Sequence, residues 1–135
     1  MGPEDGTLVV RVESRNGIGR IALLGDLDLS TVSALSDNLA NVEAADVDMI
    51  MLDVRDVTFA DASALHVFLE ARNRAAMNGH RFMIVGAGPP VRRLFELTGT
   101  GPLFGEREAA SIIDHFATGR TDVSGGTPDR SIVGA

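Results

Sequence analysis

The segment from Met49 to Gly79 constrains the fold more than any other part of the chain. It begins with MIMLDV, a short and nearly continuous apolar run, which is typical of a strand covered on both faces. After a linking segment, residues 61–79 carry apolar side chains at helical spacing, and Gly79 ends that pattern. A buried strand followed by a helix is the unit of a parallel sheet covered by helices, so we expect an α/β protein.

The chain is expected to open with an antiparallel hairpin. Residues 7–13 and 20–25 are mainly apolar or β-branched, and Asn16-Gly17 between them is the strongest short hairpin signal. The segments that follow alternate between helical and strand-like patterns. In order, they predict a helix at 31–42 with Ser30 as its N-cap, a strand at 49–54, a loop at 55–60, a helix opened by Asp61, a strand at 81–86, a helix from Pro89 to Gly99, a brief edge strand at 102–104 and a last helix at 106–118.

Apolar stripes on three of these helices are expected to face the core. They comprise Leu65, Phe68, Leu69, Arg72 and Ala76 on the first, Val91, Leu94, Phe95 and Leu97 on the second, and Ala109, Ile112, Ile113 and Phe116 on the third. We therefore predict one domain at 7–118, with a mostly parallel sheet of four to five strands, an N-terminal antiparallel hairpin and about four helices. Residues 1–6 and 119–135 are expected to be flexible ends.

Composition argues against several classes of function. The chain has 135 residues, which suits one domain, and it has no cysteine for disulfides or thiolate metal sites. Its net charge is −7, and all 12 basic residues are dispersed arginines, so nucleic-acid binding is not expected. No apolar run approaches the length of a membrane span, and no signal peptide is apparent. We expect a cytoplasmic protein without membrane attachment, metal or cofactor.

The join between the buried strand and its helix allows two interpretations. Asp61 occupies the N-cap position, and Ala62 and Ser63 follow in the first helical turn. The simpler interpretation is helix capping, which is the common role of aspartate at this position. The other is a phosphorylation switch, because a phosphate in the first turn would meet free amide groups and the positive end of the helix dipole.

Three catalytic interpretations are weak. Ser63, His66 and Glu70 share one helix face, but hydrolytic triads are assembled from separate elements. Asp53 lies at the end of a predicted strand, as does the phospho-accepting aspartate of response receivers. Sites of that kind also use a lysine, and this chain has none. The loop at 86–90 lacks the residues of a dinucleotide or P-loop motif, so it is expected to be a structural turn.

Three motifs, taken in order, resemble the STAS domain family of anti-sigma factor antagonists and their relatives. The first is Gly25-Asp26-Leu27-Asp28 before a helix, which is similar to the family's G-E/D-x-D segment. The second, LDVRDVTFADASAL at 52–65, resembles the signature L-D-L-x-x-V-x-F-x-D-S-S/T-G-L. The third, PVRRLFELTG at 90–99, resembles the P-x-V-x-R helix. The likeness extends over about residues 7–116.

The resemblance implies a binding module and no enzyme. Family members bind an anti-sigma factor, often a serine kinase, and thereby release a sigma factor that regulates bacterial transcription. The kinase phosphorylates the serine after the signature aspartate, which blocks binding. In this chain that position is Ala62, whose methyl group accepts no phosphate, and Ala64 replaces the signature glycine.

Three hypotheses follow from this departure. The protein is an antagonist that phosphorylation does not switch; or Ser63 or Thr58 has become the phosphoacceptor; or the domain is a scaffold subunit of a signalling or transport complex. A small enzyme with an unrecognised site is a further alternative. Under the first, we expect a monomer or weak homodimer whose partner surface comprises Asp26, Asp28, Asp61, Ala62, Ser63, Ala64 and Leu65.

Overall fold

The computed structural model describes residues 7–105. They form one sheet of four strands in the order β1-β2-β3-β4, in which β1 pairs with β2 antiparallel and the other neighbours are parallel. The elements are β1 (Leu8–Arg15), β2 (Ile18–Leu27), α1 (Val32–Ala44), β3 (Met49–Ala60), α2 (Ala62–Asn78), β4 (Arg81–Val85), α3 (Pro89–Thr98) and the 3₁₀-helix η1 (Gly101–Phe104). The predicted α/β fold is confirmed. The expected helix at 106–118 and both expected flexible ends lie outside the described residues.

The hairpin forms where the sequence predicts it. Asn16 and Gly17 both have positive φ, 55° and 79°, as a type I′ turn requires. The two strands pair from Leu8 opposite Gly25 to Arg15 opposite Ile18. Each strand is longer than predicted, because backbone pairing continues through polar residues that the apolar pattern left out.

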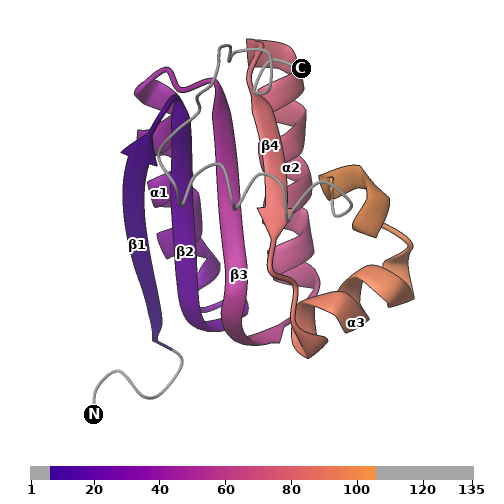
Figure 1. The fold of residues 1–135 in the computed structure, drawn as a ribbon. Coiled ribbons are helices and arrows are strands. Elements are labelled where there is room, and N and C mark those ends of the chain that lie inside the picture. Colours follow the sequence, from indigo (N-terminus) through magenta and orange to yellow (C-terminus); the bar gives the residue numbers. More distant parts are fainter. Residues whose placement is uncertain (1–6, 106–135) are drawn as a thin grey trace.

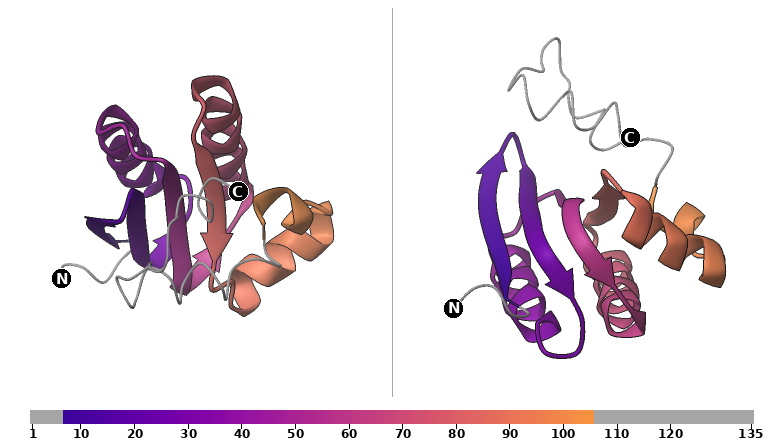
Figure 2. Two further views of the ribbon diagram at one scale, coloured as in Figure 1. Left: turned by 45° about the horizontal axis from the view of Figure 1, so that its top comes forward. Right: turned by 90° about the horizontal axis from the view of Figure 1, so that it is seen from below.

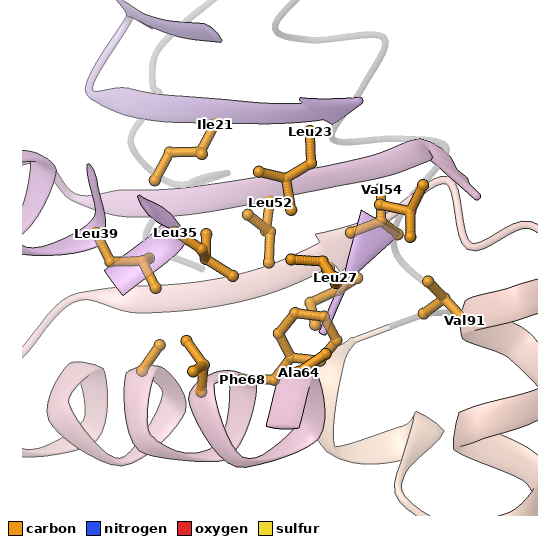
Figure 3. Packing of buried hydrophobic residues seen from close by; sticks show 14 of the residues in the cluster. Ile21, Leu23, Leu27, Leu35, Leu39, Leu52, Val54, Ala64, Phe68 and Val91 are labelled. Atoms are coloured by element: carbon orange, nitrogen blue, oxygen red, sulfur yellow. The ribbon is translucent and has the colours of Figure 1, made fainter. Parts of the chain in front are cut away.

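Helices α1 and α2 cover the same face of the sheet, while α3 and η1 lie beyond its β4 edge (Figures 1 and 2). Between sheet and helices lies the main core, to which β2 and β3 contribute Ile21, Leu23, Leu27, Leu52 and Val54 (Figure 3). Rings of Phe68, Phe82, Phe95 and Phe104 pack against one another at the α3 side of this core. We call this covered side the helix face and the opposite side the outer face.

The inner stripe of α2 differs from the prediction. Its buried residues are Ala64, Val67, Phe68, Ala71 and Ala75. Leu65 and Leu69 are only partly buried at the margins of the core, and Ala76 is exposed. Alanines at the centre of the stripe let the helix approach the sheet closely. The prediction followed the larger apolar residues and therefore placed the buried stripe to one side of its actual position. On α3, Leu97 is likewise exposed, whereas Val91 and Phe95 are buried as predicted.

Three local predictions are wrong. Residues 55–60 are not a loop but the end of β3, since they continue to pair with β2 as far as Ala60. Residues 102–104 lie in η1 and not in an edge strand, because the glycines on either side, Gly99 and Gly105, turn the chain in the left-handed region. The N-cap of α1 is Thr31 and not Ser30, whose hydroxyl donates to the Asp28 carboxylate instead.

The outer face carries a buried ionic group at its middle. Asp53 is 2% exposed and accepts hydrogen bonds from the Arg20 guanidinium at 2.7 Å and the Arg55 backbone N–H at 3.1 Å. Burial raises the pKa of Asp53, but the hydrogen bonds from Arg20 and Arg55 outweigh it and hold the pKa below its ordinary value. Gly86 backs onto this group with φ 76°, and a Cβ there would lie 3.0 Å from the Arg55 Cβ, which supports a structural turn at 86–90.

Replacing Asp53 with asparagine is expected to lower the free energy of unfolding by about 1 kcal/mol at neutral pH, because the hydrogen bonds to the charged carboxylate are replaced by weaker ones. A carboxylate whose pKa is lowered by folding stabilises the protein above its unfolded pKa of about 3.9, and that contribution disappears as pH falls through the folded value. The difference between wild type and Asp53→Asn should therefore shrink below about pH 4. Urea unfolding of both proteins at a series of pH values measures this difference in the free energy of unfolding.

Asp37→Asn, at an exposed position of α1, is the control for the Asp53 variant. A difference that is independent of pH would contradict the assignment.

Candidate functional site

The candidate site lies at one edge of the sheet, where β2 and β3 end and α1 and α2 begin (Figure 1). β2 and β3 are parallel, so their carboxyl ends meet at the same edge. The Asp61 backbone N–H donates to the Leu27 carbonyl at 3.3 Å, which joins the start of α2 to the end of β2. We call this region, comprising residues 26–31 and 58–63, the signature edge.

Asp26 and Thr58 are linked directly across the signature edge. The Thr58 hydroxyl donates to the Asp26 carboxylate at 2.6 Å. The Thr31 hydroxyl donates to the Asp26 carbonyl at 2.7 Å, so the backbone before α1 is also anchored here. Thr58, one of the two residues that the sequence suggests as alternative phosphoacceptors, is exposed, and its hydroxyl is hydrogen-bonded to this carboxylate.

Asp28 organises the loop between β2 and α1. Its carboxylate accepts hydrogen bonds from the Ser30 hydroxyl at 2.7 Å and the Ser30 backbone N–H at 3.0 Å. The hydrogen bond from the Ser30 hydroxyl is the largest cause that lowers the pKa of Asp28 below its ordinary value. The Ser30 backbone N–H and the hydroxyl and backbone of Thr31 make smaller contributions in the same direction. Asp28 is therefore ionised at neutral pH and adds a negative charge to the signature edge.

Asp61 is the N-cap of α2, as predicted. Its carboxylate accepts the Ser63 backbone N–H at 2.9 Å, and its carbonyl accepts those of Ala64 and Leu65. Ala62 is exposed and Ser63 is partly buried. No residue within 7–105 hydrogen-bonds the Ser63 hydroxyl. The capping interpretation of Asp61 is thus confirmed, while any phosphorylation of Ser63 stays a prediction.

Ala64 is not accessible to a partner. It is fully buried and packs among the core side chains beside Phe68 (Figure 3). Its small side chain lets α2 sit against the sheet, so its expected place in the contact surface is corrected to a structural one. Leu65 is partly buried against the same core and has only part of its side chain available for contact.

The triad interpretation gains no support from the geometry. His66 Nε2 lies 3.1 Å from Glu70 Oε2, but both side chains are largely exposed to solvent. No hydrogen bond joins Ser63 to either residue in the described part of the chain. Residues 7–105 also contain no cluster of acidic or histidine side chains that could hold a metal ion.

Two apolar residues at the signature edge were missed by the sequence reasoning. Leu29, in the loop before α1, is 80% exposed, and Phe59, near the end of β3, is 48% exposed. Phe59 is part of the signature pattern, but an aromatic residue between a strand and a helix is normally expected in a core. The type of this residue gives no sign that its side chain faces solvent.

A model of the STAS domain matches residues 9–117, which is most of the chain. The chain belongs to the STAS domain family. The anti-sigma-F factor antagonist RsfB of Mycobacterium tuberculosis is 27% identical over 124 residues, which cover 92% of this chain and 96% of RsfB.

Two solved structures have the same fold. An anti-sigma factor antagonist from Mycobacterium paratuberculosis matches with a TM-score of 0.72 and 22% identity, over 81% of this chain and 96% of that one. The anti-sigma factor antagonist SpoIIAA in its unphosphorylated form matches with a TM-score of 0.64 and 22% identity, over 84% and 100%. Within the described residues of this STAS domain, no helix is long and apolar enough to cross a membrane.

Proposed function

We propose that this STAS domain is an anti-sigma factor antagonist, which binds a serine-kinase type of anti-sigma factor and so releases a sigma factor in the bacterial cytoplasm. The observation that carries the proposal is the signature edge, where a capped helix start and three partly exposed carboxylates lie at the carboxyl ends of β2 and β3. The relatives named as antagonists support the same activity. The protein would act by binding and not by catalysis.

The proposed contact surface comprises the exposed part of the signature edge. Asp26, Asp28 and Asp61 would supply its negative charge, and Ala62 and Ser63 its centre. Such a surface favours a partner with basic side chains, because complementary charges speed association and exclude other partners. Binding should therefore weaken as salt is added. The remaining predictions from the sequence are retained as proposals: a domain at 7–118 between flexible ends, and a monomer or weak homodimer.

The Ala62 position separates two forms of the proposed function. With an anti-sigma kinase and ATP, the wild-type protein is expected to gain no phosphate, because a methyl group cannot accept one. Ala62→Ser places a hydroxyl at the first residue of α2, where the free amides of the helix start stabilise a phosphate, and it should become phosphorylated. Intact-mass spectrometry measures both. Phosphorylation of the wild type that Ser63→Ala abolishes, and Thr58→Val does not, would instead assign the acceptor to Ser63.

The proposed function is tested by capture from a lysate of the native host, followed by mass spectrometry and reconstitution. Capture of an anti-sigma protein with a kinase-type ATP site is the expected result. Adding this STAS domain to the purified sigma and anti-sigma pair should then restore transcription from a sigma-dependent promoter. Failure to restore transcription would overturn the proposal. Recovery of transport or multi-subunit signalling components would instead favour the scaffold alternative.

A further inference from the structure

Two irregularities in the pairing of β3 with β2 set the direction of Phe59. The first lies between Asp53 and Asp56, after which Val57 packs in the helix-face core, and the second is a β-bulge at Thr58. On β2, Gly25 and Asp26 are consecutive, but their partners on β3 are Val57 and Phe59, so Thr58 is an extra residue in that strand. A bulge of this kind re-aims the side chains that follow it. Without it, Phe59 would pair with Leu27 and point into the helix-face core; with it, Ala60 takes that place and Phe59 pairs with Asp26 on the outer face. The 2.6 Å hydrogen bond from Thr58 to Asp26 holds the bulge.

The bulge places Phe59 on the outer face near Leu24, an exposed apolar residue that pairs in turn with the exposed Val9. Val9 is opposite Leu24, and the two side chains are 39% and 49% exposed. Leu24 lies one row from the Asp26–Phe59 pair, a diagonal distance that an aromatic side chain can reach across. We call Val9, Leu24 and Phe59 the outer-face patch. Of the phenylalanines within 7–105, Phe59 is the one that joins no ring contact, so its side chain does not serve the aromatic cluster.

Carboxylates lie next to the apolar residues of the patch, one in each row. Asp56 is in register with Leu24, and Asp26 is in register with Phe59. One row toward the middle of the sheet lie Arg11, opposite Ala22, and the Asp53 group with its arginines. An apolar patch with carboxylates next to its apolar residues is complementary to an apolar surface that carries lysine or arginine.

We propose that the outer-face patch is the apolar anchor of the partner-binding surface, so that the anti-sigma factor contacts the signature edge and continues around the strand ends onto the outer face. This inference rests on the proposed function. A few buried apolar or aromatic residues supply most of the affinity of an interface, whereas charges at its rim chiefly guide association. Leu29 and Phe59 are the two large exposed apolar residues of the signature edge, and the rest of it is mostly carboxylates and small side chains. The outer-face patch extends this apolar area from Phe59 to Leu24 and Val9, so it supplies a larger anchor than the signature edge alone.

Charge argues for a basic partner and against a second copy of this chain. A symmetric dimer through the patch would place Asp26 and Asp56 of one copy near the same residues of the other. Each copy also carries a net charge of −7. Like charges brought together at an interface are destabilising, whereas a partner with basic residues around an apolar surface would neutralise them.

The test uses a photo-cross-linking amino acid, benzoylphenylalanine, placed singly at positions 59, 62 and 77 of the full chain in the native host. Position 62 reports on the signature edge, position 59 on the outer-face patch, and Met77, which is 84% exposed on the far end of α2, is the control. Cross-links to the same anti-sigma factor are expected from positions 59 and 62 and not from position 77.

A cross-link from position 62 but not from position 59 would overturn the proposed role of the outer-face patch and leave the proposed function standing. Capture from neither would overturn both, and a cross-link from position 59 to a second copy or within the chain would overturn the patch.

Affinity gives an independent measurement. The anti-sigma factor cross-linked from position 62 is purified, and its Kd is measured by calorimetry for wild type, Leu24→Ser/Phe59→Ser and Met77→Ser. The double variant is expected to bind at least fivefold more weakly, and the Met77→Ser control to bind unchanged. All three positions are exposed, so circular dichroism should show that every variant folds. A Kd within twofold of wild type for the folded double variant would contradict the proposal.

Discussion

Phe68→Ala is expected to lower the free energy of unfolding by about 3–5 kcal/mol, the range found when a large buried aromatic side chain is truncated. Phe68 is fully buried in the helix-face core, and its ring makes edge-to-face contacts with Phe95, centroids 6.3 Å apart, and with Phe104, at 6.0 Å. The substitution removes an aromatic side chain of α2 that contacts both α3 and η1. Urea unfolding followed by circular dichroism measures the loss.

The matched control for this core contact lies on the same helix. Met77→Ala shortens another large apolar side chain of α2, but that side chain is exposed, so a change within about 0.5 kcal/mol is expected. A loss of less than about 1 kcal/mol for Phe68→Ala would contradict the packing of α2 against the aromatic cluster. It would mean that α3 and η1 add little to the stability of the domain.

Ser63→Glu is expected to weaken binding of the anti-sigma factor at least about tenfold, or about 1.4 kcal/mol. The new carboxylate would lie in the first turn of α2, next to Asp61 and close to the end of β2, at the centre of the proposed contact surface. Binding would then bury a charge without a partner in an acidic setting, which is unfavourable. Calorimetric titration of the purified anti-sigma factor measures the change.

Stability and size are controlled separately for this variant. A negative charge in the first turn of a helix is favourable by about 0.3–1 kcal/mol, so Ser63→Glu should not destabilise the domain. Ser63→Gln has nearly the same size without the charge and should bind much more tightly than Ser63→Glu. Equal losses from both would show that bulk, and not charge, decides the contact. Unchanged affinity for both would remove Ser63 from the surface.

The sequence alone predicted the elements whose signals are local. The Asn16-Gly17 turn and the Asp61 cap each depend on a few neighbouring residues, and both occur as predicted. The strand at 49–54 was recognisable for the same kind of reason: all six residues are buried, and a strand buried on both sides has a nearly continuous apolar run, here broken only by Asp53. The same residues carried the resemblance to the STAS family, so the fold and the position of the signature edge follow from local sequence patterns.

Features that depend on pairing between distant segments were not predictable in this way. The polar residues at 55–60 look like a loop, but β2 supplies hydrogen-bond partners for their backbone, so they extend β3. The core side of α2 was assigned to its larger residues, whereas close approach to the sheet selects its alanines. Neither effect can be recognised from the sequence of the segment concerned, because each depends on contacts with a distant part of the chain.

For the candidate site too, some features were predictable from the sequence and others required the tertiary structure. The residues of the candidate site, including Ala62 and the three carboxylates, could be named from the sequence. Which of them face solvent was decided by the tertiary structure. The register between β2 and β3 shifts once between Asp53 and Asp56 and again at Thr58, so that Val57 packs in the core and Phe59 faces outward, while packing against the sheet buries Ala64. Side-chain direction in a strand reverses with a shift of one residue, so it depends on pairing with a neighbouring strand and not on the local pattern.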